Sequence, residues 1–329
     1  MEASVAQVLL DSRLPQLDRL LDFAVPAALR DEIAVGVRVR VPLRGGRLTA
    51  GYVVALSETS DYAGELEQVE RVVSPARVLH PEVLELARGI AERAAGNTAD
   101  VLRLAIPPRQ ARVEQRFEPP DPQPIDEGMR ELWPQLQPGT RWVADMPGGT
   151  ARVGQETVGR WAVTISEMVA ATLARGQQAI VVVPDHREQW QLQAALEETI
   201  GTERIAALDA RQSNPDRYRS FLLAGSGIPV AAVGPRSTVY APAGALGLIV
   251  VWDDGDPLLR EPLAPHVHAR DAALLRQSQS NAALVFAGHT RSTAVQRLAE
   301  LGWLQQLPLA AARRPKPLPA SFSRRPPHS

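Results

Sequence analysis

An acidic cluster follows an apolar strand-like run in the second half of the chain. Residues 246–251 read Leu-Gly-Leu-Ile-Val-Val and lead directly into Trp252, Asp253 and Asp254. Nucleotide-driven motors hold Mg²⁺ on an aspartate presented in this way at the edge of a parallel sheet. Here an indole, which can hold no metal, occupies the first position after the strand. The cluster therefore predicts a motor-like fold with altered chemistry.

The lysine that such chemistry requires is also missing from the predicted folded region. A phosphate loop places a lysine ammonium on the β- and γ-phosphates, but the one lysine in the sequence is Lys316, within a Pro/Arg-rich tail. The segment Gly149–Glu156 has the glycine spacing of a phosphate loop but ends in Gln-Glu, and no strand is evident before it. We interpret it as a glycine-containing loop.

The composition is typical of a soluble globular protein. The chain has 329 residues, of which 45% are hydrophobic, and it contains no cysteine. Disulfides and cysteine-ligated zinc are thereby excluded, and no run reaches the ~18 apolar residues of a membrane span. We expect a cytoplasmic protein without membrane contacts. A net charge of −1 provides no global attraction to nucleic acid, so such binding would depend on local arginines.

Four regions follow from the pattern of the sequence. Residues 1–105 are predicted to form short strands followed by one helix over 81–95. Residues 106–140 are rich in proline and lack periodicity, which predicts a linker. Residues 141–307 alternate apolar strands with amphipathic helices, as in a parallel α/β sheet covered on both faces. Residues 308–329 form a basic, proline-rich tail that is predicted to be disordered.

The individual elements are predicted from hydrophobic periodicity. Val37, Val39 and Val41 alternate with Arg38 and Arg40, the pattern of a half-buried strand. Strands are predicted over 5–10, 35–41, 50–56, 179–183, 229–233, 246–251 and 283–287, and helices over 164–175, 187–199, 215–224, 268–278 and 292–301.

Several short blocks form a recognisable series along the chain. They lie at 20–26, 36–42, 100–105, 179–184, 234–242, 246–251 and 268–271. Taken together, these blocks resemble one family, the primosomal replication-restart protein PriA, over its N-terminal half. The similarity is to the degenerate actinobacterial form, which lacks helicase motifs. It implies a β-rich 3′ DNA-end-binding domain followed by a degenerate RecA-like α/β lobe.

The resemblance implies a pocket for the 3′-OH end of the leading strand at a fork. Asp22 would accept a hydrogen bond from the terminal hydroxyl, and Phe23 would stack on the terminal base. Leu21 stands where the family usually has a second aromatic residue. Without the family context, Asp22 would be interpreted as a turn or cap residue and Phe23 as a core residue.

Arginines near this pocket are candidates for phosphate contacts, which position a strand without reading its sequence. They are Arg38, Arg40, Arg44 and Arg47. The alternative is a solvated strand face. Arg44 stands where the family usually has glycine. Glu67 stands where the family has a basic residue, and its charge would repel a phosphate.

Aligned with the family by spacing, three motor elements are lost. The phosphate-loop lysine and its hydroxyl partner fall on Trp161 and Ala162, and the Asp-Glu-Glu-His block becomes Trp-Asp-Asp-Gly at 252–255. The Ser-Ala-Thr block falls on Gly-His-Thr at 288–290.

We expect a degenerate nucleotide site of Trp161, Ala162, Trp252, Asp253 and Asp254, without catalytic residues. ATP, Mg²⁺ and zinc are expected for the family, but the residues they require are absent, so we expect no cofactor. The cleft between the two tryptophans should be filled by apolar packing and bind no ATP.

The second half of the sequence contains candidates for a DNA contact and for a metal site. Arg236 and Ser237 are candidates to contact single-stranded DNA by resemblance, the alternative being a strand-end turn. A metal site is conceivable at Asp253, Asp254, Asp256, His266 and His268. Their spacing matches no known ligand set, so a solvated acidic turn is the preferred interpretation.

These observations predict a replication-restart protein. It would bind stalled forks or D-loops through the 3′ end of the nascent strand and aid reloading of the replicative helicase, without helicase activity of its own. The implied partners are forked DNA with a 3′-OH end, single-stranded DNA, single-stranded-DNA-binding protein and primosome components. Two alternatives stay open: an active DNA-dependent ATPase or 3′–5′ helicase with unusual motifs, and a protein-interaction scaffold without DNA binding.

Overall fold

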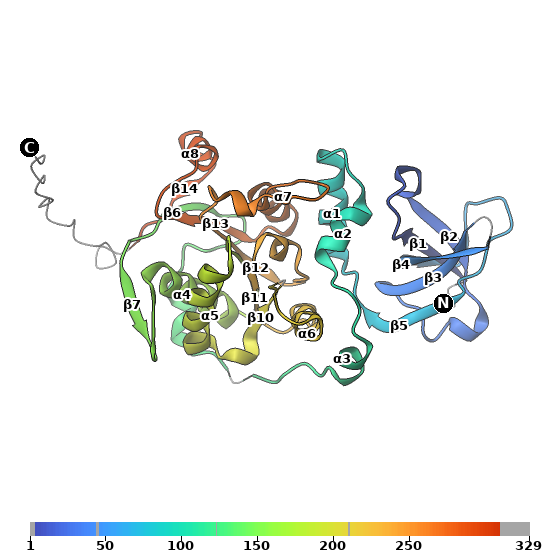
Figure 1. The fold of residues 1–329 in the computed structure, drawn as a ribbon, viewed down its shortest axis with the longest axis horizontal. Helices are drawn as coiled ribbons and strands as arrows, with labels where there is room; N and C mark the ends of the chain where they lie inside the picture. The colour runs from blue at the N-terminus through green and yellow to red at the C-terminus, as the bar shows by residue number, and fades with distance from the viewer. Residues whose placement is uncertain (1–3, 44–45, 123, 210, 310–329) are drawn as a thin grey trace, which may run out of the picture.

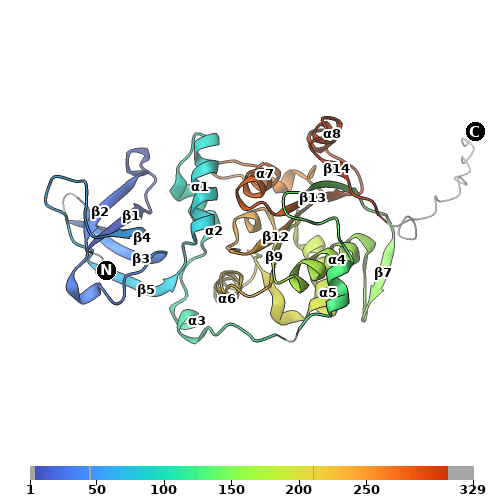
Figure 2. The ribbon, with the colours of Figure 1, turned by 180° about the vertical axis from the view of Figure 1, so that it is seen from behind.

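Two sheets of different kinds form the molecule, which is described by a computed structural model over residues 4–43, 46–122, 124–209 and 211–309. An antiparallel sheet lies at one end and a parallel α/β lobe at the other (Figure 1). Helices α1 (Pro81–Arg93) and α2 (Thr98–Ala105) stand between them in both views (Figures 1 and 2). The predicted fold class is confirmed.

The antiparallel sheet has the strand order β2-β1-β4-β3-β5. Its strands are β1 (Val5–Leu10), β2 (Leu20–Ala24), β3 (Val37–Leu43), β4 (Arg47–Ser57) and β5 (Arg71–Arg77). Val37, Val39 and Val41 are fully buried, whereas Arg38 and Arg40 are only half-buried. The predicted alternation along β3 is therefore confirmed.

The lobe contains a seven-stranded parallel sheet of order β10-β11-β9-β12-β13-β6-β14. The strands are β6 (Arg141–Asp145), β9 (Gln178–Val182), β10 (Ile205–Ala207), β11 (Ala231–Gly234), β12 (Leu246–Trp252), β13 (Ala283–Gly288) and β14 (Gln305–Gln306). The helices are α4 (Arg160–Ala174), α5 (His186–Ile200), α6 (Asn214–Ala224), α7 (Ala269–Ser280) and α8 (Thr293–Glu300).

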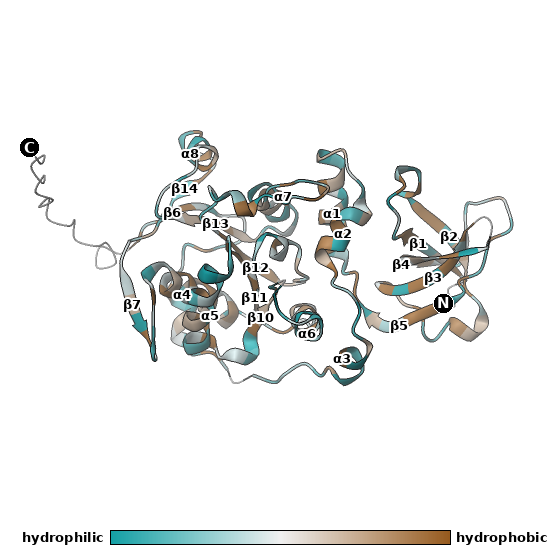
Figure 3. Cartoon of the chain, viewed as in Figure 1, coloured by the Kyte–Doolittle hydropathy of each residue, from teal (hydrophilic) through white to brown (hydrophobic). Residues whose placement is uncertain are grey.

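Successive side chains of the central strands enter two different cores. Ile249 and Val251 of β12 pack in one core with α6, α7, α1 and α2, and Val250 packs in the other with α4 and α5. Both faces of the sheet are therefore buried, as expected for parallel strands. Apolar residues follow the strands, and hydrophilic ones lie on the outer sides of the helices (Figure 3). Within the described residues, none of the helices combines the length and apolarity needed to cross a bilayer.

Several elements depart from the sequence prediction. Strands β2, β5, β6 and β10 and helix α2 were not predicted. The segment predicted as an irregular linker contains α3 (Ala111–Arg116) and a 3₁₀ turn at Glu127–Glu131, and its Trp133 and Leu136 are buried against the lobe. These apolar residues lie among prolines and charges, so no periodicity reveals them. Lys316 and most of the predicted tail lie outside the described residues.

A buried carboxylate connects the two parts of the molecule. Glu114 of α3 is 8% exposed and forms an ion pair with Arg109 at 3.1 Å. It accepts hydrogen bonds from the hydroxyl of Ser74 on β5 and from the hydroxyl of Tyr218 on α6, the latter at 2.6 Å. Burial raises the pKa of Tyr218 above its ordinary value, and the hydrogen bond to Glu114 makes the second-largest contribution in the same direction. The phenol therefore remains a donor at physiological pH.

We predict that Tyr218→Phe lowers the free energy of unfolding by ~1.5–3 kcal/mol, the contribution of a hydrogen bond to a charged acceptor. The raised pKa favours the neutral phenol in the folded state, so this stabilisation is complete below about pH 10 and declines as the pH rises further. The wild-type protein should thus lose stability above pH 10 more steeply than the variant. Denaturant unfolding from pH 7 to 11 measures both effects. Tyr62→Phe, at a residue that is 62% exposed, is the control and should unfold like the wild type.

Candidate functional site

Asp22 lies on β2 with its carboxylate held by two neutral donors. The amide of Gln7, its register partner on β1, donates to Oδ1 at 3.3 Å. The hydroxyl of Ser60 donates to Oδ2. The side chain is half-exposed, and each carboxylate oxygen can accept more than one hydrogen bond. Asp22 can therefore accept another hydrogen bond from a ligand hydroxyl.

The segment after β4 returns alongside β2 next to Asp22. The amide of Ala24 donates to the carbonyl of Glu67 at 2.9 Å, and the amide of Val69 donates to the carbonyl of Ala24 at 3.0 Å. The side chain of Glu67 is exposed. A negative charge thus lies beside the end of β2, at the edge of the candidate site.

Phe23 and Leu21 lie on the opposite side of β2 from Asp22, because side chains alternate along a strand. Phe23 is 4% exposed and packs in the interior of the antiparallel sheet, and Leu21 packs against the same core. The expectation that Phe23 stacks on a terminal base is therefore not supported by its position. Phe23 is instead a core residue, which is the other interpretation that the sequence allows.

The arginines of β3 are linked to β2 through the segment at 67–71. The amide of Glu70 donates to the carbonyl of Arg40 at 3.0 Å, and the amide of Val69 donates to the carbonyl of Ala24, so this segment lies between the two strands. Arg38 donates to the Tyr52 hydroxyl at 3.4 Å and lies over its ring at 5.4 Å from the centroid. Arg40 is half-buried and Arg47 is exposed, while Arg44 lies outside the described residues. Phosphate contacts by Arg38 and Arg40 would therefore lie across the segment at 67–71 from Asp22.

The position of a phosphate loop, between β6 and α4, is occupied by a β-hairpin. Strands β7 (Thr150–Val153) and β8 (Glu156–Gly159) pair with each other. Strand β6 does precede Gly149, contrary to the sequence interpretation. The segment is nevertheless no phosphate cradle, because an extended hairpin does not wrap its successive amides around one anion as a phosphate loop does. The amide of Gly159, at the start of α4, donates to the side chain of Gln191 at 2.8 Å.

The three altered motor positions meet at the carboxyl edge of the parallel sheet, where ligands bind in open α/β folds. Trp161 in the first turn of α4 stacks on Trp252 at the end of β12, with ring centroids 4.1 Å apart and an interplanar angle of 13°. His289 contacts Trp252 edge-on at 5.2 Å. Both tryptophans are 4% exposed and Ala162 is fully buried. Aromatic packing thus fills this part of the carboxyl edge.

The acidic residues beside this stack differ in their contacts and surroundings. Asp254 is 5% exposed, accepts from Ser292 at 2.6 Å and pairs with Arg270 at 3.5 Å. Burial raises the pKa of Asp253, and the negative charges of the neighbouring Asp256 and Asp254 add smaller contributions in the same direction. His268 caps α7, its Nδ1 accepting from the amide of Arg270. Across the described part of the chain, no three histidine or acidic side chains converge as a metal site requires.

Arg236, a candidate for contact with single-stranded DNA, is committed to an internal ion pair. Its Nε donates to Glu261 at 2.8 Å, and that carboxylate is 5% exposed. Ser237 is half-buried at the start of a 3₁₀ turn (Arg236–Tyr240). A DNA phosphate at Arg236 would therefore compete with a buried carboxylate.

Sequence reasoning missed the residues that support the candidate sites. Gln7 and Ser60 hold Asp22, and Gln191 covers the start of α4. These contacts join segments distant in the sequence, and no local pattern signals them. Strand pairing of Gln7 with Asp22 would have identified one of them, had β2 been predicted.

Comparisons with known proteins extend these observations. Residues 7–107 match the family model described as the PriA 3′DNA-binding domain. The chain is 37% identical over 314 residues to the probable replication restart protein PriA of Mycobacterium tuberculosis (strain CDC 1551 / Oshkosh), covering 92% of this chain and 47% of that protein. Identity to the Mycobacterium leprae (strain TN) protein of the same name is 36% over 297 residues, covering 88% and 46%. The chain therefore spans about half the length of these curated relatives.

Among solved structures, the yeast DEAD-box splicing factor Prp28 matches 67% of this chain and 55% of its own, with a TM-score of 0.36 and 11% identity. This similarity is too weak to carry an argument, and the sequence relatives decide the assignment. The chain belongs to the PriA family of replication restart proteins and carries the family's 3′DNA-binding domain in residues 7–107.

Proposed function

We propose that this chain binds the 3′-OH end of a nascent strand at a stalled fork or D-loop and helps to reload the replicative helicase. The observation that carries the proposal is the half-exposed carboxylate of Asp22, held by Gln7 and Ser60 within the segment that matches the DNA-binding domain. A carboxylate accepts from a terminal hydroxyl, whereas a phosphorylated end would place two negative charges together. The site would thus distinguish an end from a continuous strand.

In this proposal the lobe serves as a scaffold without motor activity. The stack of Trp161 on Trp252 supports this, because it lies where the phosphate-loop lysine and the metal carboxylate of the family fall by spacing. An ATP molecule would have to separate two indoles that are 4% exposed. The parallel sheet keeps its core without a nucleotide, since fold and catalysis are separable. Single-stranded-DNA-binding protein and primosome components would be the protein partners.

The end-binding role predicts that Asp22→Asn removes the preference for a free 3′-OH. We expect the wild type to bind a fork with a 3′-OH more tightly than the same fork with a 3′-phosphate. The variant should bind the 3′-OH fork about 10- to 100-fold more weakly, the effect of losing a hydrogen bond to a charged group. Fluorescence anisotropy with both forks measures the change.

Asp31→Asn is the matched control for this experiment. Asp31 is an exposed carboxylate of the same domain, so its replacement changes the net charge equally and should leave the preference intact. Equal binding of the two forks by the wild type, together with no effect of Asp22→Asn, would refute end recognition. Absence of any fork binding would favour the alternative of a protein-interaction scaffold.

The scaffold role predicts that ATP does not bind in the cleft between Trp161 and Trp252 and is not hydrolysed. Tryptophan emission should not change on titration with Mg-ATP, because binding would have to break the Trp161–Trp252 stack. Phosphate release should stay at background with forked DNA present. The contrary outcome is fork-stimulated turnover that Asp253→Ala abolishes, and it would establish the alternative of an active ATPase.

The same stack should stabilise the lobe. Trp252→Ala removes a large buried side chain and should lower the free energy of unfolding by ~3–5 kcal/mol. Trp190→Ala is the control, because that indole is 49% exposed on α5, and it should change stability by less than ~0.5 kcal/mol. Denaturant unfolding measures both variants, and an unfolding curve for Trp252→Ala like that of the wild type would mean that the stack contributes little.

A further inference from the structure

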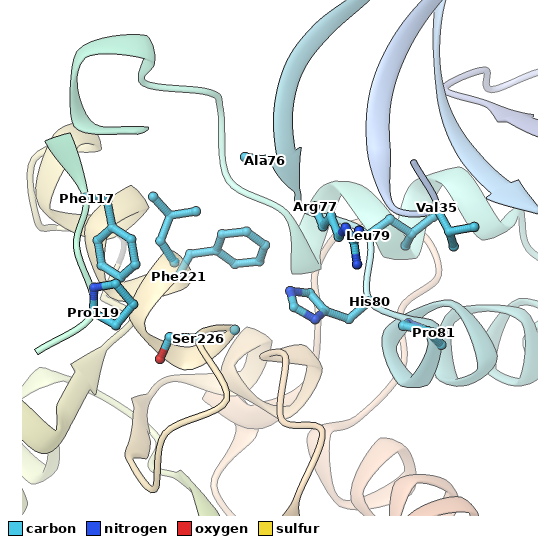
Figure 4. A pocket seen from close by; sticks show the side chains of 12 residues that line it. Val35, Ala76, Arg77, Leu79, His80, Pro81, Phe117, Pro119, Phe221 and Ser226 are labelled. Atoms are coloured by element: carbon cyan, nitrogen blue, oxygen red, sulfur yellow. The ribbon is translucent and has the colours of Figure 1, made fainter. Parts of the chain in front are cut away.

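A cavity of about 490 Å³ lies where the antiparallel sheet meets the lobe. It is bounded by the end of β5, the start of α1, the segment after α3, and α6 (Figure 4). Small-molecule sites in proteins have this size and occur preferentially between domains. The cavity is distinct from the surroundings of Asp22 and from the cleft of the two tryptophans, since it shares no lining residue with either.

Aromatic and apolar side chains form most of its wall. Phe221 is 2% exposed and packs on Tyr218 at 6.1 Å between ring centroids, which makes it a rigid floor. Phe117, which follows α3, is half-buried, so part of its ring is free to contact a ligand. Figure 4 shows both rings on one side of the cavity, and Arg77 and His80 on the other.

His80 approaches the backbone of α6 closely. A Cβ atom on Gly225 would lie 2.6 Å from its Nε2, so only glycine permits this placement of the imidazole. Burial lowers the pKa of His80, with the nearby Glu82 opposing the shift. The imidazole is therefore neutral at pH 7 and offers a hydrogen bond without a charge.

The charge of the lining points to an anionic ligand. Arg77 is exposed and contributes a guanidinium, and none of the twelve lining residues is acidic. A ligand that suits this site therefore has a flat apolar part for Phe117, a few polar edge atoms for His80 and Ser226, and a negative group for Arg77. A nucleotide has these three parts, whereas an apolar peptide segment would leave the guanidinium unmatched.

We propose that this cavity binds one nucleotide, with its base on Phe117 and its phosphate on Arg77. This proposal rests on the proposed function and deepens it. A strand whose 3′ end is held at Asp22 would make a second contact with the protein in this cavity, at the junction between the sheet and the lobe. A nucleotide within a single strand and a free mononucleotide share this chemistry. The Phe117 contact is tolerant of sequence, since every base has a π-face.

The test uses the full chain and a labelled oligo-dT whose 3′ end is blocked by phosphate, so that the Asp22 site makes no contribution. Phe117→Ala should weaken binding about 10-fold, within the range for loss of one base–aromatic contact. Arg77→Ala should reduce the slope of log affinity against log salt by about one, as expected for one phosphate contact. Trp190→Ala and Arg297→Ala, at exposed residues on α5 and α8, are the matched controls.

Competition between the oligonucleotide and a free mononucleotide shows which of the two the cavity binds. If dTMP and ATP fail to displace the oligonucleotide, the cavity takes a nucleotide of a strand. If either displaces it, and Phe117→Ala and Arg77→Ala abolish that displacement, the cavity takes a free mononucleotide. Oligonucleotide and mononucleotide binding that is unchanged in both variants would overturn the proposal. Because Asp22→Asn acts only on 3′-OH forks, failure of the end site and failure of the cavity are distinguishable.

Discussion

Burial of both faces of the parallel sheet is the constraint on which the rest of the structure depends. Side chains of β12 alternate between two cores, so each face needs its own layer of helices. Helices α4 and α5 cover one face. The other is covered by α6 and α7 together with α1 and α2, which also pack against Leu9 and Tyr52 of the antiparallel sheet. The two sheets thereby share a hydrophobic core, and their relative position is a consequence of packing.

This arrangement makes the core of the lobe independent of its carboxyl edge. The stabilising contacts come from the faces of the sheet, whereas ligands of open α/β folds bind at the carboxyl edge. Stacking of Trp161 on Trp252 adds buried aromatic area at that edge. Nearby, Arg291 forms a two-point ion pair with Asp145 at the end of β6. The edge is therefore closed by internal contacts, and the core is unaffected.

The antiparallel sheet and the junction have different properties. On β2 one face builds the core and the other leaves Asp22 half-exposed, so a single strand both stabilises the domain and presents a polar group. At the junction, Glu114 joins β5, α3 and α6 through buried polar contacts. A ligand in the adjacent cavity would contact the same three regions. Binding there would be sensitive to how the sheet and the lobe are held together.

Periodicity in the sequence determined the α/β class of the lobe and most of its strands and helices. Runs such as 246–251 carry no polar side chain because both their faces are buried, and this can be recognised locally. The family resemblance placed Trp161 and Trp252 at one cleft, and their stack at 4.1 Å agrees with the predicted apolar filling. The direction of Phe23, the partners of Asp22, the Arg236–Glu261 ion pair, the hairpin after β6 and the cavity at the junction were decided by tertiary structure. Each of these depends on contacts between segments far apart in the chain, which a local pattern does not encode.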